Sequence, residues 1–495
     1  LTGMGNAEDD GLNEYDRDKN QKQSLVLHTI ASACTTSSQF ADVQAIAIAL
    51  ESKKFSLGIQ NLSGGYTNYT YKVFLVPSVD DEEQNNDDDS DVTETQTALF
   101  VKLCFPRAFW NPDPEYVYDV ERIANEYEMM LRFAKLAPGC VATPYLLLDV
   151  GDMKLLATQW NPDDEQMGNQ FIDGVADERV AKKLAAAVAA FHCSHIDADF
   201  NTDARDCMID IFPSMEDLLL KMATNQTASS RMKELTLELG VEGCSKLFDA
   251  ATKSYREQDI PCHADLHMFN IMVEKKPQID LFSEQDDIFG ENGTFCICDW
   301  EMTMKGPLGL DMGRVYSIPV ACILAHAISG NSDVVDGIIA WLNLYWKEYS
   351  DTMTKKSGQS TNFLCKSYRN AMAWLGWKLY AISIFEWFVP FFPIESGDVG
   401  SLKESVGVVG FTLMKLGFGE GGEGLTVDDL HSRLNSTISD EIDHIKSSRR
   451  GRPSLRRKSS ILRQSNRRVS DAFKGMGRES LKKMISDLSQ VGLDK

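Results

Sequence analysis

A short segment near the middle of the chain contains side chains whose types and spacing could support proton transfer and metal binding. It holds His263-Ala-Asp265, and Asn270 follows five residues after the aspartate. An aspartate can accept the proton of an attacking hydroxyl, and an amide oxygen can ligate a magnesium ion. The apolar run Ile271-Met-Val comes next, which predicts a loop that enters a strand.

A second segment further along the chain ends a short apolar strand on two carboxylates. The strand is predicted over 295–298, and Asp299-Trp-Glu301 follows it. A carboxylate at the end of a strand is well placed to hold the magnesium ion that bridges nucleotide phosphates. Because side chains two residues apart on a strand point to the same face, Glu301 could share the metal if the strand continues.

Together the two segments favour a phosphotransfer site. The spacing His-x-Asp-Leu-x-x-x-Asn is that of the catalytic loop of protein kinases, in which the aspartate accepts the hydroxyl proton and the asparagine holds magnesium. A competing interpretation takes His263, Asp265 and His267 as the metal cluster of a hydrolase. The chain has no further histidine-rich ligand set, which disfavours that interpretation.

These motifs give the chain a family resemblance. Residues 263–271 are similar to the catalytic loop of the small-molecule kinases that include aminoglycoside phosphotransferases, choline and ethanolamine kinases and methylthioribose kinases. Asp-Trp-Glu at 299–301 stands where choline and methylthioribose kinases carry an Asp-x-Glu metal motif. The Gly-Pro-Leu-Gly-Leu-Asp-Met-Gly block at 306–313 looks most like methylthioribose kinase. The resemblance covers roughly residues 55–420.

The resemblance implies an α+β, protein-kinase-like fold with two lobes. The small N-terminal lobe would hold an antiparallel sheet, and the large C-terminal lobe would be mostly helical. ATP would be the co-substrate and Mg²⁺ the metal ion. Asp265 would be the catalytic residue, with His263 and Asp311 as structural support for its loop. The implied metal ligands are Asn270, Asp299 and Glu301.

Elements upstream of the catalytic loop are predicted to hold the nucleotide. A turn containing Gly64 and Gly65 lies between two predicted strands, and such a turn can bring backbone N–H groups close to phosphate oxygens. Choline kinase has a similar turn ending in asparagine, so Asn68 joins the candidates. Lys102 is a single lysine in an apolar strand, and Glu126 lies in the helix that follows. In the family such a lysine pairs with the phosphates and with the helix glutamate.

Two further groups of residues are candidates for the adenine and for the acceptor. Gln159 and Trp160 end a predicted hairpin, where a kinase-like fold has the hinge that hydrogen-bonds the adenine. The late helix around Trp374 and Trp377 is rich in aromatic residues. An aromatic wall there would suit a quaternary ammonium group, although core packing is the simpler interpretation of a single tryptophan. His267 is the third acceptor-binding candidate.

Composition narrows the class of protein. The chain has 495 residues, 43% hydrophobic, and a net charge of −23, which suits a globular protein of two or three domains and argues against nucleic acid as the main ligand. No apolar run has the length expected of a transmembrane segment. Eleven scattered cysteines are typical of reduced, mostly buried thiols, which indicates a cytoplasmic protein.

The C-terminal tail differs from the rest. Residues 446–468 hold ten Lys or Arg and no acid, so the tail suits an acidic membrane surface or a calmodulin-like partner. Its arginines precede Ser459, Ser460 and Ser470, which are candidates for phosphorylation. The predicted domains are a disordered acidic N-terminus over 1–20, N-terminal helices over 21–54, a nucleotide-binding lobe over 55–160 with an acidic insertion at 80–91, a catalytic and acceptor-binding lobe over 161–445, and the basic tail over 446–495.

The function predicted is transfer of the γ-phosphoryl group of ATP to a hydroxyl of a small molecule. The Gly-Pro-x-Gly-x-Asp block favours a methylthioribose-like sugar as acceptor, whereas the aromatic late helix favours an amino alcohol of the choline or ethanolamine type. A non-catalytic nucleotide-binding scaffold, recruiting partners through its basic tail, is the alternative.

Overall fold

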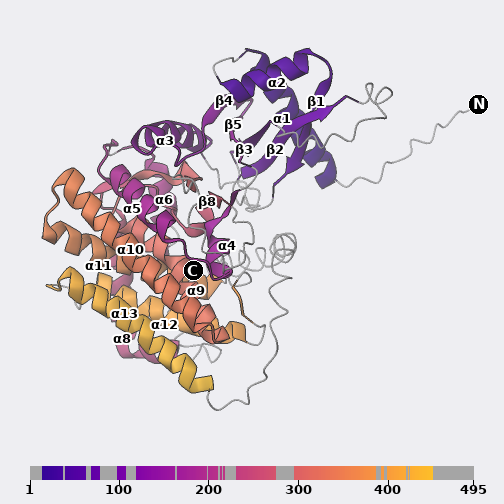
Figure 1. The fold of residues 1–495 in the computed structure, drawn as a ribbon. Helices are drawn as coiled ribbons and strands as arrows, with labels where there is room; N and C mark the ends of the chain where they lie inside the picture. The colour runs from indigo at the N-terminus through magenta and orange to yellow at the C-terminus, as the bar shows by residue number, and fades with distance from the viewer. Residues whose placement is uncertain are drawn as a thin grey trace, which may run out of the picture. The chain divides into compact units, whose positions relative to one another are not determined.

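The chain folds into two compact units, Leu1–Ala124 with Thr143–Trp160 and Asn125–Ala142 with Asn161–Lys495. They are called the first and the second unit below, and each is described by itself (Figure 1). The structure, a computed structural model, describes residues 14–36, 40–62, 68–78, 97–106, 119–161, 164–197, 199–209, 212–213, 216–217, 230–274, 295–385, 392–394, 398–419, 422 and 424–449.

The first unit is built on one five-stranded sheet in the order β1-β2-β3-β5-β4, with every neighbouring pair antiparallel. Lys102, in the middle of β3, stands opposite Thr70 of β2 and Leu156 of β5. The hairpin predicted before residue 160 is β4 with β5. The strands are β1 (Phe55–Asn61), β2 (Asn68–Pro77), β3 (Ala98–Cys104), β4 (Pro144–Val150) and β5 (Met153–Gln159).

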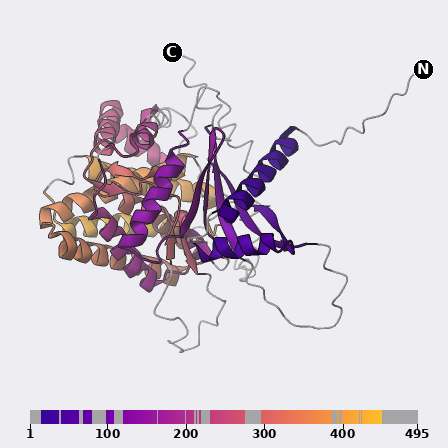
Figure 2. The ribbon, with the colours of Figure 1, turned by 90° about the horizontal axis from the view of Figure 1, so that it is seen from above.

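Two helices, α1 (Glu14–Thr36) and α2 (Ala41–Glu51), pack on this sheet (Figure 2). Val26 and Ile30 of α1 and Val43 and Ile46 of α2 are fully buried in one apolar cluster with the strands. Burying apolar side chains from both helices removes the inner face of the sheet from water, which is the main stabilising force for such a layer. Helix α1 begins at Glu14, within the segment 1–20 for which disorder is predicted.

Helix α3 (Arg122–Leu136) starts in the first unit and continues into the second. In the second unit, Phe133 packs against Trp300, with ring centroids 4.6 Å apart. The second unit also contains two small antiparallel sheets, with the strand orders β6-β8-β9 and β10-β7. Their strands are β6 (Asp164–Gln166), β7 (Ile260–Cys262), β8 (Ile271–Glu274), β9 (Phe295–Ile297) and β10 (Met304–Gly306).

Helices make up most of the second unit, and α9 (Leu310–Ser329) is its central element. Every residue of α9 from Leu310 to Ile328 is buried, so this helix is covered on all sides, as expected for a helix surrounded by others. The remaining helices are α4 (Met167–Ile172), α5 (Glu178–His192), α6 (Thr202–Ile209), α8 (Ser230–Tyr255), α10 (Ser332–Ser357), α11 (Thr361–Phe385), α12 (Val399–Phe418) and α13 (Val427–Arg449), with 3₁₀ turns η2 (Met268–Asn270) and η3 (Trp300–Met302).

Glycines let α9 and α11 approach each other closely. A Cβ atom on Gly313 of α9 would lie 2.6 Å from the backbone nitrogen of Leu375 and 2.7 Å from the carbonyl oxygen of Ala371, both on α11. Atoms do not pack at such distances, so any larger residue would push the two helices apart. Gly313 therefore sets the spacing between the helices that carry Arg314 and Lys378.

One helix in the described part of the chain, α9, is long and apolar enough to cross a membrane, and 89% of its most apolar window is buried inside the second unit. This match rests on length and composition alone, and burial to this extent is typical of a core helix, so the helix does not contradict the expectation of no transmembrane segment. The ten cysteines whose side chains the structure describes are free thiols.

The expectation of a mixed protein of helices and antiparallel sheets is confirmed. The arrangement of two kinase-like lobes stays a prediction, as do the predicted domain boundaries. The acidic insertion at 80–91, the basic tail from 450 onward and its three serines lie outside the described residues.

Candidate functional site

Asp265 lies in the loop between β7 and η2, where its side chain and its backbone are both held. One carboxylate oxygen accepts a hydrogen bond from Nη1 of Arg314 at 2.7 Å. The Nδ2 group of Asn270 donates to the backbone oxygen of Asp265 at 2.9 Å. The side chain of Asp265 keeps 28% of its surface exposed, so a substrate can reach it. Since the amide nitrogen of Asn270 is used in this way, its Oδ1 is the side-chain atom that could ligate a metal.

Asp311, at the start of α9, anchors the backbone of the same loop. Its carboxylate accepts the N–H of His263 at 2.7 Å and the N–H of Ala264 at 2.8 Å. Nε2 of His192 donates to it at 3.0 Å, and Nδ1 of that ring lies 2.8 Å from the hydroxyl of Tyr349. Asp311 is completely buried, and Ala264 has a φ of 65°. The anchor therefore holds the loop in a backbone conformation that a residue with a Cβ rarely adopts.

Replacing Asp311 with Ala is expected to lower the free energy of unfolding of the second unit by about 3–5 kcal/mol. The change leaves two buried N–H groups and a buried imidazole without their acceptor. Urea unfolding followed by tryptophan fluorescence measures the loss. Asp311→Asn keeps one acceptor oxygen and should lose about half as much. A loss below about 1 kcal/mol for the alanine variant would contradict the anchoring role.

The anchor also sets a pH dependence. Burial by itself raises the pKa of Asp311. The hydrogen bonds and electrostatic interactions with His192 and His263 lower it by more than burial raises it, so the net pKa is below its ordinary value of 3.8. The stability contributed by the ionised carboxylate is therefore complete above that ordinary value and is lost as the pH falls through the lowered one.

His263 joins the catalytic loop to the second segment. Its Nε2 lies 2.9 Å from the carbonyl oxygen of Cys298, and its ring packs on Trp300 with centroids 4.7 Å apart. The N–H of Cys298 donates to the carbonyl oxygen of Asn270 at 2.9 Å. Strands β8 and β9 pair Ile271 with Ile297. The two segments that carry the sequence motifs are thus fastened side by side within the second unit.

Three carboxylates, from Glu126, Asp299 and Glu301, come together beyond the end of β9. One oxygen from each lies within 4.8 Å of the others, and Glu126 and Glu301 are only 3% and 4% exposed. Asp299 has φ 66° and ψ 54°, a left-handed conformation that turns the chain so that both acids face Glu126. The strand does not continue, and η3 brings Glu301 back to the site instead of the strand alternation that the sequence suggested.

The three acids fit a divalent cation. All their donor atoms are carboxylate oxygens, the ligands that Mg²⁺ prefers. Carboxylates gathered in a partly buried place repel one another, and a bound cation offsets that repulsion. The sequence analysis placed Asp299 and Glu301 at the metal but gave Glu126 to Lys102, so Glu126 is the metal-ligand candidate that it missed.

The side chains around Asp265 set its protonation. Burial by itself raises the pKa of Asp265, but His267, Arg314 and Lys378 lower it more, so the net pKa is lowered and the carboxylate is ionised. Burial lowers the pKa of His267 to about 3. Nδ1 of this neutral ring accepts the N–H of Phe269 at 3.2 Å, so its proton is on Nε2, which lies 3.6 Å from Asp265.

Several predicted nucleotide contacts lie in the first unit. Lys102 is 5% exposed, and its predicted partner Glu126 belongs to the second unit, so the pair stays a prediction. The amide oxygen of Asn68 accepts from Arg122 at 3.0 Å, and that of Gln159 accepts from the hydroxyl of Thr143 at 3.1 Å. Nζ of Lys72 lies 5.3 Å from the centre of the Trp160 ring. Gly64 and Gly65 lie outside the described residues.

The predicted acceptor residues Trp374 and Trp377 lie on α11 and line a cavity in the second unit, together with Arg314 and Lys378. The sequence analysis gave no role to Arg314 and Lys378. A usable signal was present, since each is a cation within a helix whose neighbours are apolar or aromatic. His192, at the end of α5, is a hydrogen-bond partner of Asp311.

No model of a protein family matches the chain, and no curated protein matches it. Among solved structures, a protein from Haemophilus somnus 129PT, provisionally described as a fructosamine-3-kinase, is similar over 78% of this chain and 92% of its own, with 10% identity and a TM-score of 0.29. A similarity this low does not separate a shared fold from a shared mixture of helices and sheets.

Proposed function

We propose that this protein is a small-molecule kinase that transfers the γ-phosphoryl group of ATP to a hydroxyl group. The observation that carries the proposal is that the loop of Asp265, an ionised and partly exposed carboxylate, is fastened to the segment that carries Asp299 and Glu301, which meet Glu126. Phosphoryl transfer needs both features, a carboxylate that orients the attacking hydroxyl and oxygen ligands for the metal that accompanies the nucleotide.

The lowered pKa of Asp265 indicates its role in the transfer. An ionised carboxylate accepts a hydrogen bond from the acceptor hydroxyl and fixes its direction of attack. A carboxylate this acidic is a weak base, so Asp265 takes the proton only as the new oxygen–phosphorus bond makes the hydroxyl acidic. Arg314 and Asn270 keep Asp265 in place throughout.

The metal would be held by Glu126, Asp299 and Glu301, with Oδ1 of Asn270 as a further candidate ligand. When bound, Mg²⁺ supplies neutralisation of the phosphate charge. Lys102 is proposed to contribute positive charge to the phosphates, and the turn that contains Gly64 and Gly65 to contribute backbone N–H groups. Gln159 and Trp160 are proposed to contact the adenine. The motif resemblance to choline and methylthioribose kinases supports these roles.

Turnover by the purified full chain tests the proposal. ADP release with Mg²⁺ and ATP is measured against hydroxyl compounds of three kinds: amino alcohols, sugars including methylthioribose, and hydroxy acids. We expect at least one acceptor to be phosphorylated, at a rate of about 1–100 per second, and the activity to disappear when the metal is chelated.

A matched control separates the site from the rest of the unit. Asp336 is an exposed aspartate on α10, so Asp336→Asn should keep full activity. Tight ATP binding without transfer to any acceptor in the three classes would overturn the proposed reaction and favour the nucleotide-binding scaffold.

A further inference from the structure

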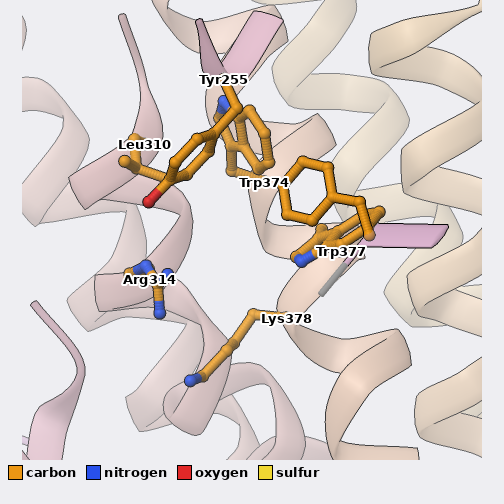
Figure 3. A pocket seen from close by; sticks show the side chains of 7 residues that line it. Tyr255, Leu310, Arg314, Trp374, Trp377 and Lys378 are labelled. Carbon is orange, nitrogen blue, oxygen red and sulfur yellow. The ribbon is translucent and has the colours of Figure 1, made fainter. Parts of the chain in front are cut away.

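A cavity next to Arg314, the partner of Asp265, is lined mainly by three helices of the second unit. Tyr255 ends α8, Arg314 belongs to α9, and Trp374 and Lys378 belong to α11. Figure 3 shows the aromatic rings on one side of the cavity and the charged ends of Arg314 and Lys378 on the other. The complete lining is Phe212, Tyr255, Leu310, Arg314, Trp374, Trp377 and Lys378.

The cavity is small in this structure. Its enclosed free volume is about 10 Å³, within a wider hollow of about 230 Å³ that is partly open to solvent. A space of that enclosed size is near the lower limit for one water molecule. A ligand therefore enters only with a compact polar group, and flexible side chains such as Lys378 must give way to it.

Three polar atoms of the lining have no hydrogen-bond partner among the residues that the structure describes. They are Nε of Arg314, the hydroxyl oxygen of Tyr255 and Nε1 of Trp374. The three residues are 7%, 1% and 2% exposed, respectively. Buried polar groups are almost always paired because leaving them unpaired costs stability. Three in the lining of one cavity indicate a place built for a ligand, and all three atoms can donate a hydrogen bond.

The charge of the cavity indicates the sign of that ligand. Burial and the charge of Arg314 lower the pKa of Lys378 to about 8, and Asp265 opposes that shift. Lys378 is thus mostly protonated at neutral pH. Two cations face this space, and the acid that acts on both of them, Asp265, is itself paired with Arg314 at 2.7 Å. A quaternary ammonium group would be repelled here, whereas an anion would be attracted.

We propose that the acceptor is a short hydroxy acid whose carboxylate enters this cavity while its hydroxyl meets Asp265. The carboxylate would accept hydrogen bonds from Tyr255, Trp374 and Nε of Arg314, with Lys378 adding charge. Since the same guanidinium binds Asp265 through Nη1, only a few covalent bonds can separate the acid group from the reacting hydroxyl. This inference rests on the proposed function and replaces the amino alcohol and the sugar as acceptor.

The reaction balances with ATP as the only co-reactant. The hydroxyl oxygen of the acid forms a bond to the γ-phosphorus of ATP, and the bond from that phosphorus to the β,γ-bridging oxygen breaks. ADP leaves with that electron pair. The hydroxyl proton passes to Asp265 and then to solvent, and the product is the phosphorylated hydroxy acid.

A set of matched acceptors tests whether the cavity selects a negatively charged group. Glycerate, glyceramide and glycerol differ only in the group next to the hydroxyls, and choline and glycerol 3-phosphate complete the set. We expect kcat/KM for glycerate to exceed that for glyceramide or glycerol at least about tenfold, as for loss of hydrogen bonds to a charged group. A preference for choline, glycerol or glyceramide would overturn the inference while leaving the proposed kinase activity intact. A preference for glycerol 3-phosphate would overturn the carboxylate in favour of a phosphate.

Variants test the cavity itself. Tyr255→Phe removes only an unpaired hydroxyl and should raise KM for glycerate about tenfold with kcat little changed. Tyr345 is the matched control, because its hydroxyl is also buried and unpartnered but does not line the cavity. Tyr345→Phe should leave KM unchanged. Equal effects of the two changes would contradict the assignment.

Lys378→Met tests the charge with the length of the side chain kept. The variant should lose most of the preference for glycerate over glyceramide, while Lys347→Met, at an exposed lysine on α10, should keep it. Calorimetric titration of glycerate into the ADP-bound protein provides a readout that does not depend on turnover. Binding to the Lys378→Met protein as tight as to the unchanged one would overturn the role of the cavity. No turnover of any acceptor would instead count against the proposed function.

Discussion

An Asp265→Asn protein is expected to bind ATP with nearly unchanged affinity and to lose phosphoryl transfer by about 10²–10⁴-fold. Asparagine keeps the shape of the side chain and one oxygen that can accept from Arg314. It cannot take the proton of the acceptor hydroxyl, and it removes the negative charge that orients that hydroxyl. The rate of a single turnover with saturating ATP and acceptor measures the loss directly.

The control for this experiment is that the Asp265→Asn protein keeps its fold. Its melting temperature should lie close to that of the unchanged protein, because Asp311, and not Asp265, anchors the loop backbone. A variant that keeps more than about a tenth of the single-turnover rate would contradict the role given to Asp265.

The second large effect is expected for Asp299→Asn, which should weaken divalent-metal binding about 10- to 100-fold or more and reduce transfer accordingly. The backbone of Asp299 is left-handed, with φ 66°, and asparagine tolerates that conformation better than alanine does. The substitution therefore changes the ligand charge and leaves the turn in place. Binding of Mn²⁺ to the ATP complex, followed by electron paramagnetic resonance, measures the affinity without reference to turnover.

Glu126→Gln provides the informative partner to that experiment. If Glu126 belongs to the metal cluster, the variant should weaken Mn²⁺ binding as Asp299→Asn does. If its role is confined to pairing with Lys102, Mn²⁺ affinity should hold while ATP affinity falls. The exposed-site variant Asp336→Asn should affect neither.

The loop that is proposed to be catalytic could be predicted from the sequence because its contacts are local. Asn270 bonds to the backbone of Asp265 across five residues, and spacing alone reports such a contact. The strands next to the two motifs, β8 after the first and β9 before the second, could be predicted from short apolar runs in the same way. The mixture of helices and antiparallel strands follows from the same periodicities.

The metal cluster could be predicted only in part. Asp299 and Glu301 are neighbours in the sequence, but they meet through a left-handed residue and a 3₁₀ turn. Glu126 joins them from a helix far away in the chain. Helical periodicity indicates on which face of its helix a glutamate lies. The sequence does not indicate which acids the tertiary fold brings opposite that face.

The cavity next to Arg314 was decided entirely by the tertiary structure. Its cations come from two helices, α9 and α11, which approach closely because Gly313 has no side chain. Apolar periodicity indicates that both helices are buried, but it gives no information about which buried cation faces which loop. The sequence by itself determined the loop in which the reacting group is proposed to lie, because the contacts of that loop depend on local spacing. The packing of helices decided the charge beside them, because that depends on contacts between residues distant in the chain.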